Sequence, residues 1–368
     1  MRRSLLSGQP LSLAGFFVSL VAGMLLVWIV IGLWVEFAPA TVLPPDYTRN
    51  LAKQEMAHQC GKYDTIIFGD SKARAGIDPA DLNFPSLNLA ESGFNPAIDY
   101  YRAKDLLKCE RWPNFVVLSY SPWALRHMTP TETNSLAIAR MLPLDDIAKI
   151  FDSIQAEHEE SILAPVDFEA TPPFSTLPPA LRILLYKSKM PLFYAPSILS
   201  SLESGVLPRW RYNWHVYSLT LQRRGQEFYA PMPGNDKIFP DGSAFHEPTS
   251  LVMDEYFNRL IKLFTTRHIQ VLIVPMPINQ VTLDSITPEA AKVYGIWLSG
   301  VTAKFPGAYA MEPALAPWPV AMFGDFYGHP SAKGAHAVST LIGRCISLLR
   351  AHDKAAGAVA CPISHDAI

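Results

Sequence analysis

A serine at a predicted strand-to-helix junction is the residue best placed to do chemistry. Residues 65–68 are β-branched or aromatic and predict a short buried strand, which Gly69 and Asp70 end and Ser71 follows at the start of a helix. A serine in this position can act as a nucleophile if a base lies within reach. The alternative is a loop that only caps the helix, since Asp and Ser are favoured caps.

A candidate base lies near the other end of the chain. Asp325 and His329 occupy a loop before an amphipathic run over residues 337–349, which predicts the last helix. A carboxylate a few residues before a histidine can orient the imidazole, which can then accept the proton of a serine. The chain order Ser, Asp, His is one of several convergent triad arrangements. We therefore predict Ser71, Asp325 and His329 as catalytic residues.

These segments resemble the SGNH, or GDSL-type, hydrolase superfamily over residues 64–122 and about 250–350. The Gly-Asp-Ser box at residues 69–71 matches the first block of that family, and the resemblance makes its serine the nucleophile. Asp325 and His329 match the fourth block. This chain has one residue more between them than the usual Asp-x-x-His spacing of the family.

The resemblance also implies an oxyanion hole. Residues 87–96 look like the second block, whose glycine donates a backbone N–H and is here Gly93. The third block usually carries Gly-x-Asn-Asp, but the predicted strand at residues 115–118 leads into Ser-Tyr-Ser-Pro. Ser121 therefore stands in the place of the oxyanion asparagine. The implied donors are the N–H groups of Ser71 and Gly93, helped by Ser121.

Other polar residues near these blocks are candidates for contact with a substrate. They are Asp70, Asn95, Arg126, His127, Asp241 and His246. His127 is also a rival to His329 as the base. Asp241 and His246 belong to a polar segment that is more simply explained as an ordinary surface turn. No phosphate-binding loop and no metal-ligand spacing is found, so we predict neither a cofactor nor a metal.

Composition narrows the class of protein. The chain has 368 residues, a net charge of −2 and only 17% charged residues, a balance that excludes an electrostatic footprint for nucleic acid. Although 32 prolines are present, 49% of the residues are hydrophobic, which argues for loops rather than disorder.

The N-terminal region predicts a membrane anchor. Residues 11–35 contain no charged side chain. This run is long enough for a helix of about 20 residues to span a bilayer. Arg2 and Arg3 precede this run, so we predict a cytoplasmic tail at 1–10, an anchor at 11–37 and a stalk at 38–62 that leads to a domain outside the cytoplasm. A cleaved signal peptide is the alternative, but the apolar run exceeds an ordinary signal-peptide core.

The remaining pattern alternates strands and helices and predicts an α/β fold. We expect a three-layer α/β/α domain over residues 63–350, with a parallel sheet of the flavodoxin-like order 2-1-3-4-5. A less regular insertion at about 123–248 is expected above the carboxyl edge of the sheet, and a tail at 351–368. Cys60 and Cys109 precede neighbouring strands and are predicted to pair. Cys345 and Cys361 are left either paired or free.

The combination of anchor and Ser-Asp-His blocks is similar to the membrane-anchored SGNH-like proteins of bacterial envelope acylation systems. Examples are the proteins of alginate O-acetylation and of teichoic-acid D-alanyl transfer. The resemblance implies an O-acyltransferase, most simply of acetyl, that modifies a polysaccharide through an acyl-serine beside a membrane-bound O-acyltransferase. The site would then face the periplasm from the bacterial inner membrane. Two alternatives stay open: a periplasmic esterase, and a non-catalytic binding or scaffold subunit.

Overall fold

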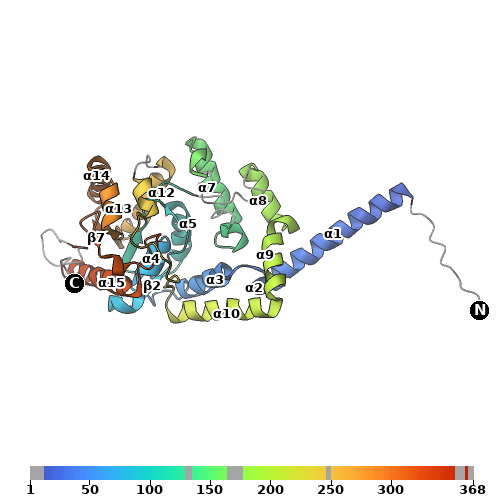
Figure 1. Cartoon of the computed structure of the whole chain (residues 1–368), viewed down its shortest axis with the longest axis horizontal. Coiled ribbons are helices and arrows are strands. Elements are labelled where there is room, and N and C mark those ends of the chain that lie inside the picture. The colour runs from blue at the N-terminus through green and yellow to red at the C-terminus, as the bar shows by residue number, and fades with distance from the viewer. Residues whose placement is uncertain (1–11, 129–134, 164–176, 246–249, 353–360, 364–368) are drawn as a thin grey trace, which may run out of the picture.

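A computed structural model describes residues 12–128, 135–163, 177–245, 250–352 and 361–363. A five-stranded parallel sheet of order β2-β1-β3-β4-β6 forms the centre of the molecule (Figure 1). Its strands are β1 (Thr65–Gly69), β2 (Ser86–Asn88), β3 (Phe115–Ser119), β4 (Gln270–Ile273) and β6 (Ala308–Ala310). The predicted parallel α/β sheet and its strand order are confirmed.

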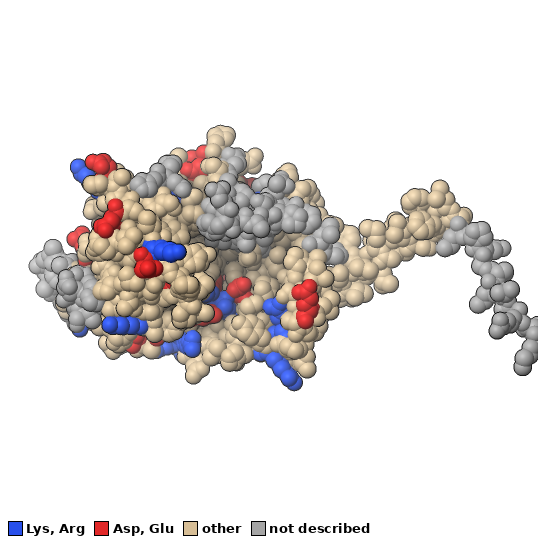
Figure 2. All heavy atoms as spheres, in the orientation of Figure 1, with Lys and Arg blue, Asp and Glu red and all other residues tan. Residues whose placement is uncertain are grey.

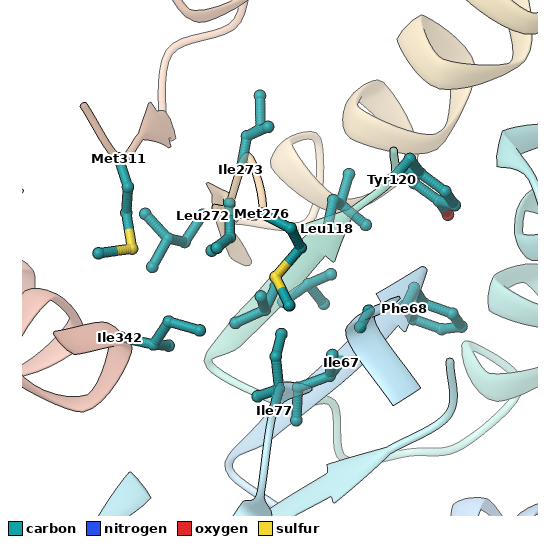
Figure 3. Close-up of a cluster of buried hydrophobic side chains, with 14 of the residues drawn as sticks. Ile67, Phe68, Ile77, Leu118, Tyr120, Leu272, Ile273, Met276, Met311 and Ile342 are labelled. Carbon is teal, nitrogen blue, oxygen red and sulfur yellow. The ribbon is translucent and has the colours of Figure 1, made fainter. Parts of the chain in front are cut away.

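The strands form because their apolar residues are buried on both faces. β1 and β3 are buried throughout, which is typical of the central strands of a parallel sheet. Their pairing runs from Thr65 opposite Phe115 to Gly69 opposite Ser119, so both strands end at the same edge. Figure 3 shows Phe68, Leu118 and Ile273, which lie opposite one another on three neighbouring strands, among the buried side chains of the core.

Helices cover both faces of the sheet. One layer holds α5 (Pro96–Leu106), α12 (Leu251–Thr265) and α14 (Pro288–Lys304), which contact one another through pairs such as Phe257 and Trp297. The other layer holds α4 (Ser71–Gly76), the short helix η1 (Pro79–Leu82) and α15 (Ala332–His352). The connection from β1 to β2 and the connections that follow β2 lie on opposite faces, as right-handed crossovers require because the direction of strand addition reverses at β2.

Small elements complete the domain near the carboxyl edge. A two-stranded parallel sheet pairs β5 (Ile278–Asn279) with β7 (Pro317–Trp318). Short helices flank it, namely α11 (Pro240–Ala244), α13 (Gln280–Ser285) and η3 (Val320–Met322).

The N-terminal helix α1 (Leu13–Phe37) projects from the body of the molecule (Figure 1). It is the one described helix that is long and apolar enough to cross a membrane. Figure 2 shows it as a rod without charged side chains along most of its length.

The segment at 38–62 is not the solvated stalk that the sequence predicts. It forms α2 (Pro39–Val42) and α3 (Pro45–Ala57), which pack against α10 (Val206–Gln222). Polar side chains of α3 that resemble a solvated surface in the sequence are buried, among them Arg49 and Lys53. Partners supplied by distant parts of the chain make this burial possible, as described below.

The insertion contains more helix than the sequence predicts. It folds into α7 (Leu144–Ala156), η2 (Glu160–Leu163), α8 (Pro179–Lys187), α9 (Pro191–Ser204) and α10, besides α11. Only parts of it lie at the carboxyl edge of the sheet. Figure 1 shows α8, α9 and α10 on the side of the molecule that adjoins α1 and α3. The expectation that the whole insertion covers the sheet edge is therefore wrong for these three helices.

Both pairs of cysteines form disulfides. Cys60 is bonded to Cys109, as predicted, with 5.4 Å between their Cα atoms. Cys345 of α15 is bonded to Cys361, which answers the question that the sequence leaves open. This second bond and the buried Ile363 hold part of the predicted tail at 351–368 against the domain.

Candidate active site

The turn between β1 and α4 places Ser71 at the carboxyl edge of the sheet. Gly69 has φ 150° and lies directly against β3, where an added Cβ would overlap the carbonyl oxygen of Ser119. Only glycine fits this close approach. Below the turn, buried Asp99 accepts hydrogen bonds from the Gly69 N–H at 3.1 Å and from the Tyr120 hydroxyl at 2.8 Å. The position of Ser71 is thus set from both sides.

Asp70 serves this turn with both carboxylate oxygens. One oxygen accepts from the backbone N–H of Lys72 at 2.9 Å and caps α4. The other accepts from the N–H of Ser121 at 2.7 Å, which ties α4 to the loop after β3. The sequence predicts Asp70 as a contact for substrate. The structure instead engages its carboxylate with the backbone, although the residue lines the cavity described below.

Ser71, His329 and Asp325 form a continuous hydrogen-bonded relay. The Nε2 atom of His329 lies 2.9 Å from the Ser71 hydroxyl oxygen, and its Nδ1 atom lies 2.6 Å from an Asp325 carboxylate oxygen. Because an ionised carboxylate can only accept, Nδ1 carries the proton and Nε2 is free to accept from the serine. This is the geometry in which an imidazole acts as a general base.

Asp325 is held ionised behind the histidine. Its burial works against ionisation, but hydrogen bonds from the His329 ring and from two backbone N–H groups outweigh this and lower its pKa below the ordinary value. Those backbone donors belong to Tyr327 and His329 themselves. The additional residue between Asp325 and His329 is absorbed in this turn, where Gly328 has φ 80°.

The relay opens into a cavity of about 260 Å³. Its lining includes two predicted oxyanion donors, Gly93 and Ser121, beside Ser71. Gly93 has φ 70°, a value that favours glycine in this loop. Ser121 donates its backbone N–H to Asp70 and accepts at its hydroxyl from the Ala124 N–H at 3.3 Å. The hydroxyl proton is therefore the donor that Ser121 can offer to an oxyanion.

Two predicted substrate contacts are not among the described residues that line the cavity. Asn95 is buried and caps α5, accepting from backbone N–H groups at 3.1 and 3.2 Å. Arg126 is buried as well, donates to the Pro122 carbonyl at 3.0 Å and lies over the ring of Phe245. His246 lies outside the described residues.

Two further candidates do line the cavity. The ring of His127 packs on Trp123, with 4.1 Å between the ring centres. The Ser71 hydroxyl is hydrogen bonded to His329. Asp241 is buried and forms an ion pair with Lys72, so the alternative of a plain surface turn is wrong for this residue. Burial raises the pKa of Asp241 above its ordinary value, and the Lys72 ammonium partly opposes this.

Tyr229 is one residue of this site that sequence reasoning missed. Its ring stacks on His329 with 4.0 Å between ring centres and 15° between planes. Its hydroxyl is hydrogen bonded to Ser92, and the guanidinium of Arg74 lies 4.4 Å from the centre of its ring. Tyr229 belongs to an irregular part of the insertion, where no periodicity or motif marks it. Burial raises its pKa to about 12, so the phenol stays neutral.

A buried charge network supports the tyrosine from below. Glu91 accepts hydrogen bonds from Arg74 and from the Ser92 N–H, and lies 3.3 Å from the Lys53 ammonium. Arg49 of α3 lies 3.7 Å from the same carboxylate and pairs with Glu227. These contacts explain why the polar face of α3 is buried, and they link α3 to the surroundings of His329.

The arrangement can generate a serine alkoxide equivalent beside a small, partly aromatic cavity. Within the described part of the chain, no group of His, Cys, Asp and Glu side chains is arranged to hold a metal ion. Comparison of the sequence with protein-family models and curated proteins, and of the structure with solved structures, found no match.

Proposed function

We propose that this protein is a membrane-anchored, SGNH-like serine O-acyltransferase that modifies a cell-envelope or exported polysaccharide. The observation that carries the proposal is the relay from Asp325 through His329 to Ser71, with 2.6 and 2.9 Å between its atoms. Such a relay activates a serine for attack on an acyl carbonyl.

The reaction proceeds in two steps. In the first, His329 takes the Ser71 proton while the serine oxygen attacks the acyl carbonyl of the donor. We expect the N–H groups of Ser71 and Gly93 and the Ser121 hydroxyl to donate to the developing oxyanion, and His329 then protonates the leaving group. In the second step, His329 deprotonates a sugar hydroxyl that attacks the acyl-serine, which releases the ester product and restores Ser71.

Two features favour transfer to a glycan. The partly exposed aromatic side chains of Trp123 and Tyr327 line the cavity beside the relay and offer apolar surface on which a sugar ring can stack. The apolar helix α1 would hold the site next to a membrane-bound O-acyltransferase that supplies the acyl group, and tethering raises the effective concentration of that donor.

The proposed location is the bacterial inner membrane, with the N-terminus in the cytoplasm and the site in the periplasm. Arg2 and Arg3 before α1 favour this orientation by the positive-inside rule. The disulfides Cys60–Cys109 and Cys345–Cys361 agree with an oxidising compartment.

The test is the acyl content of the envelope polysaccharide in cells that carry Ser71→Ala. A matched control is Ser299→Ala, an exposed serine of α14. We expect Ser71→Ala to lower the acyl content and Ser299→Ala to leave it at the wild-type level. A raised acyl content in Ser71→Ala cells would instead identify an esterase. An unchanged content would exclude both enzymes and leave a binding or scaffold subunit.

A further inference from the structure

Exposed apolar side chains gather on the helices that surround the base of α1. Each is 38–61% exposed, and they lie on α8, α9 and the first half of α10: Leu181, Leu184, Leu199, Leu202, Leu207, Trp210, Tyr212 and Trp214. We call α8, α9 and residues 206–214 the collar. Figure 1 shows α8 and α9 on the side of the body from which α1 projects. Exposed apolar patches of this kind mark surfaces that are covered in the working protein.

The collar is attached directly to the chain that leaves α1. Asn213 of α10 donates to the carbonyl oxygens of Ala40 and Leu43 at 2.7 and 3.0 Å, and the Ser201 hydroxyl of α9 donates to Thr41. The exit point of α1 is therefore fixed on the collar. Any bilayer that α1 crosses must end near this surface.

Contacts along α1 give the level at which the collar meets such a bilayer. The Trp28 indole N–H donates to the Ser188 carbonyl at 2.8 Å, in the turn between α8 and α9. A bilayer core about 30 Å thick takes about 20 helical residues, so a core that begins at Leu13 ends near Gly32. The α8–α9 turn contacts Trp28, about 6 Å before that end, and so lies in the outer part of the hydrocarbon.

The polar residues of the collar suit the same level. Lys187 ends α8 and Lys189 lies in the α8–α9 turn, where it forms an ion pair with Glu36 near the end of α1. Arg209 and Arg211 alternate with the exposed Trp210 and Tyr212 on α10. Aromatic rings beside basic residues are typical of elements that lie at the headgroup level of a bilayer.

We propose that the collar lies in the headgroup region of the bilayer that α1 crosses, with its leucines in the outer edge of the acyl chains. The occupant of this apolar surface is lipid. The proposal rests on the anchoring role of α1 within the proposed function, and not on the chemistry of Ser71. Its consequence is that the domain is held at a fixed height and orientation above the membrane instead of swinging on a flexible tether.

The experiment measures lipid contact at single introduced cysteines. All four native cysteines are in disulfides, so a thiol-reactive fluorophore labels only the new site. The full-length protein is prepared as Leu202→Cys, Met24→Cys or Val293→Cys, which are exposed positions on the collar, on α1 and on α14. Each is placed in nanodiscs of phosphatidylethanolamine and phosphatidylglycerol that carry a nitroxide quencher near the headgroup or in the middle of the acyl chain.

We expect Leu202→Cys to lose most of its fluorescence with the headgroup quencher and Met24→Cys with the mid-chain quencher, whereas Val293→Cys stays bright with both. Quenched Met24→Cys together with an unquenched Leu202→Cys would overturn the proposal while leaving the anchor intact, and would assign the collar to a protein partner. Unquenched Met24→Cys would overturn the proposal and the anchoring of the proposed function, without touching the chemistry of Ser71.

Discussion

Replacing Glu91 with glutamine removes the carboxylate on which the charge network beneath the candidate active site depends. Glu91 is 2% exposed, and three cations approach it, from Arg74, Lys53 and Arg49. Burial opposes ionisation, but these cations outweigh it and hold the pKa of Glu91 well below its ordinary value. Because the folded-state pKa is lowered, the stabilisation is present at neutral pH and is lost only in acid.

Breaking a buried ion pair by removing one partner costs about 3–5 kcal/mol, because the remaining charge stays buried. Glu91→Gln leaves Arg74 in this state, so we expect a loss of that size in the free energy of unfolding. Lys53 can escape it by losing its proton, because burial lowers its pKa to about 7. For a domain of this size the loss corresponds to a decrease of about 10 °C in Tm. Glu227→Gln is the matched control, since Glu227 also pairs with Arg49 but its side chain is 34% exposed. We expect the control to lose about 1 kcal/mol.

The same substitution should reach the active site. Arg74 lies under Tyr229, whose ring stacks on His329, so a displaced guanidinium removes support from the imidazole. We expect kcat for a chromogenic acetyl ester to fall in Glu91→Gln and to change little in Glu227→Gln. The measurements are thermal unfolding followed by circular dichroism and ester turnover, both on the full-length protein. Equal stability losses in the two variants would refute the argument that burial makes Glu91 the critical member.

Three further changes probe the site and its frame. Burial raises the pKa of Asp99 to about 6, so the folded protein disfavours the ionised carboxylate. We therefore expect the free energy of unfolding of the wild type, relative to Asp99→Asn, to fall by about 3 kcal/mol as pH rises from about 4 to about 7. Denaturant unfolding at each pH measures this. Gly69→Ala should abolish ester turnover by displacing Ser71, while retained activity would show that the turn tolerates a Cβ. Cys60→Ser removes a disulfide between residues 49 positions apart, and Cys361→Ser removes one between residues 16 positions apart. The longer loop constrains the unfolded chain more, so we expect Cys60→Ser to lower the free energy of unfolding by about 1 kcal/mol more than Cys361→Ser, measured under oxidising conditions.

Local signals explain what could be predicted from the sequence. The buried strand before Gly69 and the amphipathic run after His329 mark their own elements by periodicity, and parallel connections bring both to one sheet edge. The structure accordingly brings Ser71, Asp325 and His329 together. Their catalytic roles stay predictions. The Cys60–Cys109 bond follows from the same strand order.

The features that could not be predicted depend on contacts between distant segments. Arg49 and Lys53 look like residues of a solvated stalk because their counter-charges, Glu91 and Glu227, lie far away in the chain. Asp241 looks like part of a surface turn, but Lys72 pairs with it inside the molecule. In each case a charge that local reasoning assigns to solvent is neutralised by a residue that only the fold brings near.

The most direct test of the central claim is acylation of Ser71 itself. The full-length protein is incubated with a chromogenic acetyl ester, quenched in acid and analysed by peptide mass spectrometry, beside Ser71→Ala and His329→Ala. The account predicts one acetyl group on the peptide that contains Ser71, none at that position in Ser71→Ala and far slower labelling in His329→Ala. Labelling of Ser71 at an equal rate without the His329 imidazole, or acetylation only at other residues, would contradict it.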